Sequence, residues 1–273
     1  MRGGWRQPAQ HQSPEFQSPE FQSPEFQSPE FQPPELQPPG RQPAGPSRAA
    51  RLLPAPLRLP AAAVLAFCVT VTVLLGITFA GQRHAGWLDT AVDTPVKSAL
   101  KRFPALLNVL ADTGSLVPVT LMTLALVLAC VLTRRWSGAV LAAVATPAAS
   151  ALTEFVLKPL VGRTMAGLLS FPSGHATSMF ALAGTCAVLL LDPPGLRVPG
   201  AVRLLLASLA LLAATTVAIG MVGLGAHYFT DAVSGAAVGT GTVLACALIL
   251  DWLGPDRGAL SWGVSRRPAR RSS

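Results

Sequence analysis

The sequence predicts an all-α integral membrane protein, in which a bundle of six transmembrane helices follows a disordered, proline-rich N-terminal tail. Hydrophobic residues make up 51% of the chain and charged residues only 12%, whereas roughly 25% of the residues in average soluble domains are charged. Six apolar runs follow the tail, and most are near the ~20 residues that a helix needs to cross a bilayer core. Only helices and closed barrels span lipid, and these runs lack strand alternation, so we expect helices.

Residues 1–60 differ in composition from the rest of the chain. A unit of the form Gln-Ser-Pro-Glu-Phe recurs from Gln12 to Phe31 and then changes to Pro-Pro-Glu-Leu and Pro-Pro-Gly. Frequent proline prevents regular helices and strands, and little apolar surface is available for burial. We therefore expect a disordered cytoplasmic tail, with a proline-rich ligand for a protein partner as the alternative. The first apolar run starts too late for a signal peptide.

The membrane domain is expected over residues 61–252, with a basic C-terminal tail over residues 253–273. The loop over residues 81–114 carries apolar residues at helical spacing, so it is either an interfacial helix on the membrane surface or a solvated connector. Each of the four cysteines lies in an apolar run without metal-ligand spacing, which indicates small buried hydrophobes. The six runs are Ala61–Ala80, Ser115–Thr133, Ser137–Leu157, Ala176–Leu191, Ala201–Val222 and Ala232–Leu250.

The basic residues predict the orientation of the chain. The net charge is +8, and a cytoplasmic N-terminal tail would put 15 of the 21 Lys and Arg residues on the cytoplasmic side. The positive-inside rule then predicts a multi-pass protein of the cell membrane with both termini in the cytoplasm. A nucleic-acid partner is not expected, because the basic residues lack interleaved aromatic residues and a nucleic-acid motif. The six outer basic residues are Arg83, Lys97, Lys101, Arg102, Lys158 and Arg163.

Two histidine motifs stand directly before apolar runs that begin at the outer face. Phe171–His175 reads Phe-Pro-Ser-Gly-His and precedes the fourth run, whereas His227–Asp231 reads His-Tyr-Phe-Thr-Asp and precedes the sixth. The free backbone N–H groups at Ser173, Gly174 and His175 and the helix dipole would attract an anion. We therefore predict an anion-binding site at the start of the fourth run.

Charged residues near these motifs favour phosphate as the anion. Lys158 ends the third run, and Arg163 follows in a short loop at the same expected depth. Both would add positive charge to the helix start. Glu154, near the end of the same run, is interpreted as a helix-packing or interface carboxylate, and His84 as a surface residue.

The histidines suit phosphoryl transfer. His227 and Asp231 are four residues apart and would share a helix face. The carboxylate can keep one ring nitrogen protonated and leave the other as a nucleophile, while His175 protonates the leaving oxygen. Water would then cleave a phosphohistidine intermediate, and this chemistry requires no metal or cofactor.

These motifs resemble those of the type 2 phosphatidic acid phosphatase (PAP2) superfamily. Lys158–Arg163, Pro172–His175 and Gly225–Asp231 are similar to its first, second and third motifs, and the resemblance covers roughly Ala61–Leu250. It implies a six-helix bundle that removes phosphate from a lipid phosphate or diphosphate without metal. It also implies roles for individual residues: His227 as nucleophile, Asp231 as its orienting partner, His175 as general acid, and Ser173, Gly174 and Lys158 as phosphate ligands.

The chain departs from the family pattern at two arginines. The Arg-Pro pair of the first motif falls on Met165 and Ala166, and the Ser-Arg pair of the third motif falls on Gly220 and Met221. Removing one transition-state donor costs about 10²–10³ in rate. Arg163 could replace one guanidinium, the site could act slowly or on a substrate with a different charge, or it could bind phosphate without cleaving it.

The leading hypothesis is thus a membrane phosphatase that acts on a lipid phosphate at the outer face of the bilayer. The second is a catalytically impaired relative that binds lipid phosphate or scaffolds partners through its tail. A small transporter or channel is disfavoured, because the polar residues gather at one face rather than near the middle of the membrane.

Overall fold

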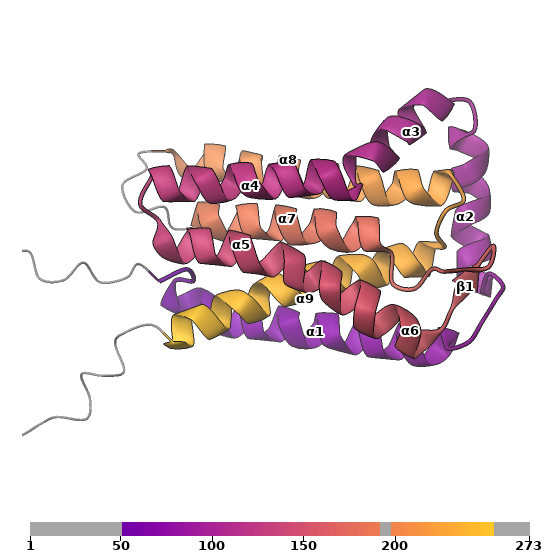
Figure 1. Ribbon diagram of the computed structural model, residues 1–273, viewed down its shortest axis with the longest axis horizontal. Helices are drawn as coiled ribbons and strands as arrows, with labels where there is room; N and C mark the ends of the chain where they lie inside the picture. The colour runs from indigo at the N-terminus through magenta and orange to yellow at the C-terminus, as the bar shows by residue number, and fades with distance from the viewer. Residues whose placement is uncertain (1–50, 192–197, 254–273) are drawn as a thin grey trace, which may run out of the picture. The chain divides into compact units, whose positions relative to one another are not determined.

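The computed structural model describes residues 51–191 and 198–253, which form helices and one short hairpin (Figure 1). The predictions for residues 1–50 and for the tail from residue 254 lie outside the described residues. The first helix begins at Ala55, so residues 55–60, which were expected to belong to the tail, are helical. Pro54 directly precedes this helix and Pro56 is its second residue, where proline is tolerated, whereas Pro60 lies inside the helix.

Six long helices correspond to the six predicted apolar runs. The third is extended by a π-helix, η1 (Leu152–Leu157), and by a short helix, α6 (Lys158–Val161). Among the described residues, five segments are long and apolar enough to cross a membrane, and α4 becomes a sixth when it is counted with α3 (Pro104–Thr113), from which it is bent by 51°. The long helices are α1 (Ala55–Phe79), α4 (Leu116–Leu132), α5 (Trp136–Ala151), α7 (Gly174–Leu191), α8 (Gly200–Gly223) and α9 (Phe229–Leu253).

Large apolar side chains cover the outside of these helices. Phe67 and Ile77 on α1 and Leu204 on α8 are each about 70% exposed. Such exposure is unfavourable in water and is expected where helices face lipid. The chain is therefore a multi-pass membrane protein.

Helix α7 lies at the centre of the bundle, packed against α5, α8 and α9. Its buried side chains are mostly small, and α9 carries glycine where the two backbones meet. A Cβ atom on Gly239 would lie 2.3 Å from the carbonyl oxygen of Thr177, and one on Gly235 would lie 2.5 Å from that of Ser173. Glycine therefore allows the close approach of α7 and α9.

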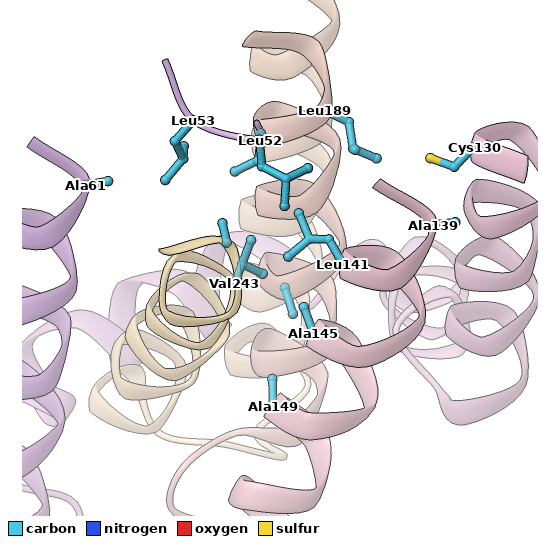
Figure 2. Packing of buried hydrophobic residues seen from close by; sticks show 13 residues of the cluster. Leu52, Leu53, Ala61, Cys130, Ala139, Leu141, Ala145, Ala149, Leu189 and Val243 are labelled. Atoms are coloured by element: carbon cyan, nitrogen blue, oxygen red, sulfur yellow. The ribbon is translucent and has the colours of Figure 1, made fainter. Parts of the chain in front are cut away.

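A hydrophobic cluster joins the helices at the end of the bundle where the described chain starts and ends (Figure 2). Leu52 and Leu53 are buried, and their N–H groups donate to the Asp251 carboxylate near the end of α9, at 2.7 and 3.0 Å. The start of α1 and the end of α9 thus lie at the same end of the bundle, opposite the hairpin (Figure 1).

The connector over residues 81–114 forms two packed helices, α2 (Trp87–Leu100) and α3. Helix α2 contacts α8 and α9, and α3 contacts α8. Val96 packs against a buried cluster, and Leu107 is 3% exposed. The connector is therefore part of the fold rather than a solvated loop, and its place in a membrane interface stays a prediction.

A two-stranded hairpin, which was not predicted from the sequence, connects α6 to α7. Its strands are β1 (Thr164–Met165) and β2 (Leu168–Leu169). The two loop residues, Ala166 and Gly167, have φ values of 51° and 83°. Positive φ at both positions is the geometry of a type I′ turn, whose twist matches that of paired strands.

Candidate active site

A cavity of about 630 Å³ opens at the hairpin end of the bundle. It lies between the start of α7, the α3–α4 bend, the η1–α6 segment, the hairpin and the loop before α9. The lining combines a few polar groups with apolar side chains, as ligand sites generally do. The lining residues with ionisable side chains are His175, His227, Glu154 and Lys158. Gly174, at the start of α7, also lines the cavity.

The structure brings the two histidines together. His175 follows the first residue of α7, His227 precedes α9, and their ring centroids are 6.5 Å apart with the rings tilted by 57°. Because both line the cavity, a group bound there can contact both imidazoles. His84, by contrast, is exposed, as expected for a surface residue.

Ser173 and Gly174 have different positions at the start of α7. Ser173 is fully buried and does not line the cavity; its Oγ accepts the N–H of Ala176 at 3.4 Å, and its N–H donates to the carbonyl of Asp231 at 3.0 Å. It thus has the position of an N-cap residue and links α7 to α9. Gly174 lines the cavity, so its backbone is the part of the motif that a ligand can reach.

Lys158 lines the cavity, but it is paired with a carboxylate. Its Nζ lies 2.8 Å from an oxygen of Glu154, one turn earlier in the chain, and its side chain is only 15% exposed. Glu154 belongs to η1, and π-helical turns are frequent at functional sites. Glu154, which was interpreted from the sequence as a helix-packing or interface carboxylate, also lines the cavity.

Arg163 does not line the cavity. Its side chain is fully buried, Nη1 donates to Asp231 at 2.6 Å and to Thr230 at 2.7 Å, and Nη2 donates to Asp89 at 2.5 Å. The guanidinium also lies over the Phe79 and Tyr228 rings, at 4.1 and 4.2 Å. All of these partners are groups of the protein. The expected contact between Arg163 and phosphate is therefore replaced by a structural ion pair.

His227 and Asp231 face each other without a direct hydrogen bond. His227 Nδ1 lies 3.8 Å from Asp231 Oδ2, beyond hydrogen-bonding distance, and has no other partner among the described residues. Asp231 Oδ2 accepts the N–H of Tyr228 at 3.2 Å. Catalytic hydrogen bonds are often long before substrate binds.

Two aspartates on α2, which sequence reasoning missed, hold the start of α9. Asp93 accepts the N–H of Phe229 at 3.0 Å, and Asp89 accepts the N–H and hydroxyl of Thr230 at 2.9 and 2.7 Å. The first N–H groups of α9 are thus satisfied by another helix. The signal in the sequence was a pair of carboxylates four residues apart beside an apolar helical stripe.

The two carboxyl groups have opposite pKa shifts. Burial raises the pKa of Asp89, but hydrogen bonds from Thr230, Arg163 and Gly86 outweigh it and hold the pKa below its ordinary value. Burial also raises the pKa of Asp93, and its bond from Phe229 and the nearby Lys97 do not offset that effect. Relative to an ordinary carboxyl group, the fold therefore favours the ionised form of Asp89 more and that of Asp93 less.

The two methionines at the family's arginine positions lie in different surroundings. Met165, in β1, is partly exposed and lines the cavity. Met221, in α8, is 5% exposed and does not line it. A cationic side chain could therefore reach the cavity from position 165. Within residues 51–191 and 198–253, no group of three or more His, Cys, Asp or Glu residues is arranged to hold a metal ion.

Comparisons with known proteins agree with this architecture. A family model described as "PAP2 superfamily" matches residues 59–255, and no curated protein sequence matches significantly. The chain is similar in structure to a protein described as the first transmembrane PAP2 type phosphatidylglycerolphosphate phosphatase from Bacillus subtilis. The TM-score is 0.55 at 20% identity, over 67% of this chain and 93% of that chain. At this identity the similarity concerns the fold.

Proposed function

Since the chain belongs to the PAP2 superfamily, we propose that it is a membrane lipid phosphatase that hydrolyses a lipid phosphate monoester or diphosphate. The observation that supports this most directly is the pair of imidazoles, 6.5 Å apart, in one cavity with Lys158 and the first residue of α7. A cation and a helix start together favour an anionic group beside the histidines.

In the first step, the free ring nitrogen of His227 attacks the phosphorus atom. The bond from phosphorus to the lipid oxygen breaks, and that oxygen takes a proton from His175 as the lipid alcohol leaves. Asp231 holds the proton on Nδ1 of His227, which keeps the attacking nitrogen unprotonated and stabilises the charge that develops on the ring.

In the second step, water replaces the histidine on phosphorus. His175, now neutral, takes a proton from the water as the phosphorus–nitrogen bond breaks, and inorganic phosphate leaves. Lys158 and the backbone N–H groups at the start of α7 stabilise the phosphate oxygens in both steps. Arg163 acts at a distance in this scheme, because it fixes the carboxylate of Asp231.

The cavity faces the outside of the cell, and both termini are cytoplasmic. The positive-inside rule supports this orientation, with 15 of 21 basic residues on the inner side. The start of α1 and the end of α9 lie at the end of the bundle opposite the hairpin (Figure 1), and the hairpin borders the cavity, which agrees with this orientation.

Phosphate release tests the proposal. The full chain in detergent is given phosphatidate or a polyprenyl diphosphate in buffer with a metal chelator, and is compared with His227→Ala. We expect metal-independent phosphate release that the substitution abolishes. Equal activity of the two proteins would refute the nucleophile assignment.

A second function is a catalytically impaired protein that binds lipid phosphate. The observation in its favour is that Met165 lines the cavity where the family pattern has arginine, while Glu154 neutralises Lys158. Binding of a lipid phosphate without release of inorganic phosphate from phosphatidate or the polyprenyl diphosphate would favour this second function.

A further inference from the structure

We propose that Glu154 is a specificity-determining residue, which makes the cavity favour a phosphate monoester over a diphosphate. The inference rests on the proposed function and names the substrate class within it. It follows from where the Glu154 carboxylate lies and from the small number of positive groups around it.

The Glu154 carboxylate lies at the place where an anion would bind. Its oxygens are 2.8 Å from Lys158 Nζ, and a Cβ atom on Gly174 would meet Oε1 at 2.5 Å and Lys158 Nζ at 3.9 Å. The carboxylate thus contacts the first residue of α7 and the cation beside it. The start of a helix and a lysine both attract anions, so the Glu154 carboxylate competes with the phosphate of the substrate for both.

The cavity has few other positive groups. Among the lining residues that the structure describes, Lys158 and Glu154 carry the only formal charges besides the two histidines. Arg163 is enclosed by Asp89 and Asp231. Lys97 stands at the rim, where a Cβ atom on Gly225 would lie 3.8 Å from its Nζ, but that Nζ is 3.7 Å from Asp93. Lys158 and Glu154 cancel, so the formal charge of the lining is zero with both histidines neutral and only +1 with His175 protonated, as the first step of hydrolysis requires.

A low charge in the cavity selects between phosphate groups. A phosphate monoester carries about −1.5 to −2 at neutral pH, and the second phosphate of a diphosphate adds further negative charge. One phosphate can displace the carboxylate from Lys158 and take its place. The second phosphate of a diphosphate would lie among serine hydroxyls and apolar side chains such as Leu168, near the displaced Glu154 carboxylate. Repulsion of the extra charge therefore disfavours the diphosphate.

Equilibrium binding tests this without turnover. The probes are inorganic phosphate and pyrophosphate, titrated into the full chain in detergent with His227→Ala as the background. We expect Glu154→Gln to tighten pyrophosphate binding about tenfold, which is about 1.4 kcal/mol, and to tighten phosphate binding less. The glutamine keeps the shape of the side chain and removes its charge.

Asp112→Asn is the matched control, because Asp112 is an exposed aspartate that does not line the cavity. It removes the same charge, and we expect unchanged affinity for both probes. Equal changes in the two affinities for Glu154→Gln, or no change in either, would overturn the inference.

Turnover separates this inference from the proposed function. With the natural His227, Glu154→Gln should lower KM for a polyprenyl diphosphate more than for phosphatidate. Selective tightening of pyrophosphate in a protein that hydrolyses neither lipid would support the inference and refute the phosphatase. Turnover of both lipids with an unaltered KM ratio in Glu154→Gln would leave the phosphatase and refute the role of Glu154.

Discussion

Nη1 of Arg163 lies 2.6 Å from Oδ1 of Asp231, and neither side chain is exposed to solvent. The other end of the guanidinium is bound by Asp89 on α2. One arginine thus connects the hairpin segment, the connector helix and the first turn of α9, directly behind His227. Its charge stabilises the carboxylate that orients the proposed nucleophile, and it does not contact the cavity.

Arg163→Met should destabilise the protein strongly. Removal of one partner of a buried ion pair leaves the other charge unpaired, which costs about 3–5 kcal/mol, and here two aspartates would lose their partner. We expect a clear fall in the melting temperature of the protein in detergent. Arg102→Met removes the same charge from an exposed side chain and should have little effect. Similar melting temperatures for both variants would contradict the structural role of Arg163.

The two aspartates of α2 should respond oppositely to neutralisation. Because the folded state lowers the pKa of Asp89, its ionised form stabilises the fold above the ordinary pKa of about 3.9, and this contribution is lost as the pH falls. Burial raises the pKa of Asp93, so its ionisation destabilises the fold as the pH rises through that raised value.

At neutral pH we therefore expect a lower melting temperature for Asp89→Asn and an equal or higher one for Asp93→Asn. The Asp93→Asn difference should shrink as the pH falls through the raised pKa of Asp93, and the Asp89→Asn difference only as the pH falls below the ordinary value of about 3.9. Thermal unfolding from neutral pH down to about pH 3 checks both. A loss of stability for Asp93→Asn at neutral pH as large as that for Asp89→Asn would contradict the assignment.

Several features were predictable from the sequence because they depend on local patterns. The apolar runs correspond to long helices, since runs of this length in lipid leave few alternatives. The His175 and His227 motifs lie at the same end of the bundle, since the number of crossings between them fixes that relation. The family resemblance is confirmed by the match over residues 59–255.

Other features depend on tertiary contacts that no local pattern encodes. The ion pairs of Arg163 were not predicted, because its partners, Asp89 and Asp231, lie 74 and 68 residues away in the chain. The role of Glu154 depends on a π-helical turn and on contact with Gly174. The hairpin uses a non-glycine residue, Ala166, at positive φ, and such a residue gives no strong turn signal.

An arginine at position 165 should raise activity. Met165 lines the cavity, so Met165→Arg can place a guanidinium beside the phosphate, and one such donor contributes about 10²–10³ in rate. We expect phosphate release to rise roughly 10²-fold. Met221→Arg should instead lower the melting temperature, because Met221 is buried outside the cavity and a buried unpaired charge is costly. A folded Met165→Arg protein whose rate of phosphate release is no higher than that of the natural protein would contradict the proposed phosphate position.

The close contact of α7 with α9 should be sensitive to one methyl group. A Cβ atom on Gly239 would lie 2.3 Å from a backbone oxygen of α7, so Gly239→Ala must push the two helices apart, at a cost of about 1–3 kcal/mol. Because His175 and His227 stand at the starts of these helices, phosphate release should fall as well.

Gly184→Ala is the matched control in the same pair of helices. Its Cβ atom would meet the Val243 side chain at 3.6 Å, an ordinary contact, and alanine favours a helix over glycine by about 1 kcal/mol. We expect equal or higher stability and unaltered activity. Equal losses in the Gly184→Ala and Gly239→Ala proteins would contradict the packing argument.

The most direct test of the account is whether phosphate becomes attached to His227 during turnover. The full chain is mixed with a lipid phosphate that carries a radioactive phosphate label, the reaction is quenched within one turnover, and the labelled peptide is identified. We predict an acid-labile phosphate on the peptide that contains His227 and no labelled protein for His227→Ala. Label on another residue, or undiminished phosphate release by His227→Ala, would contradict the two-histidine mechanism.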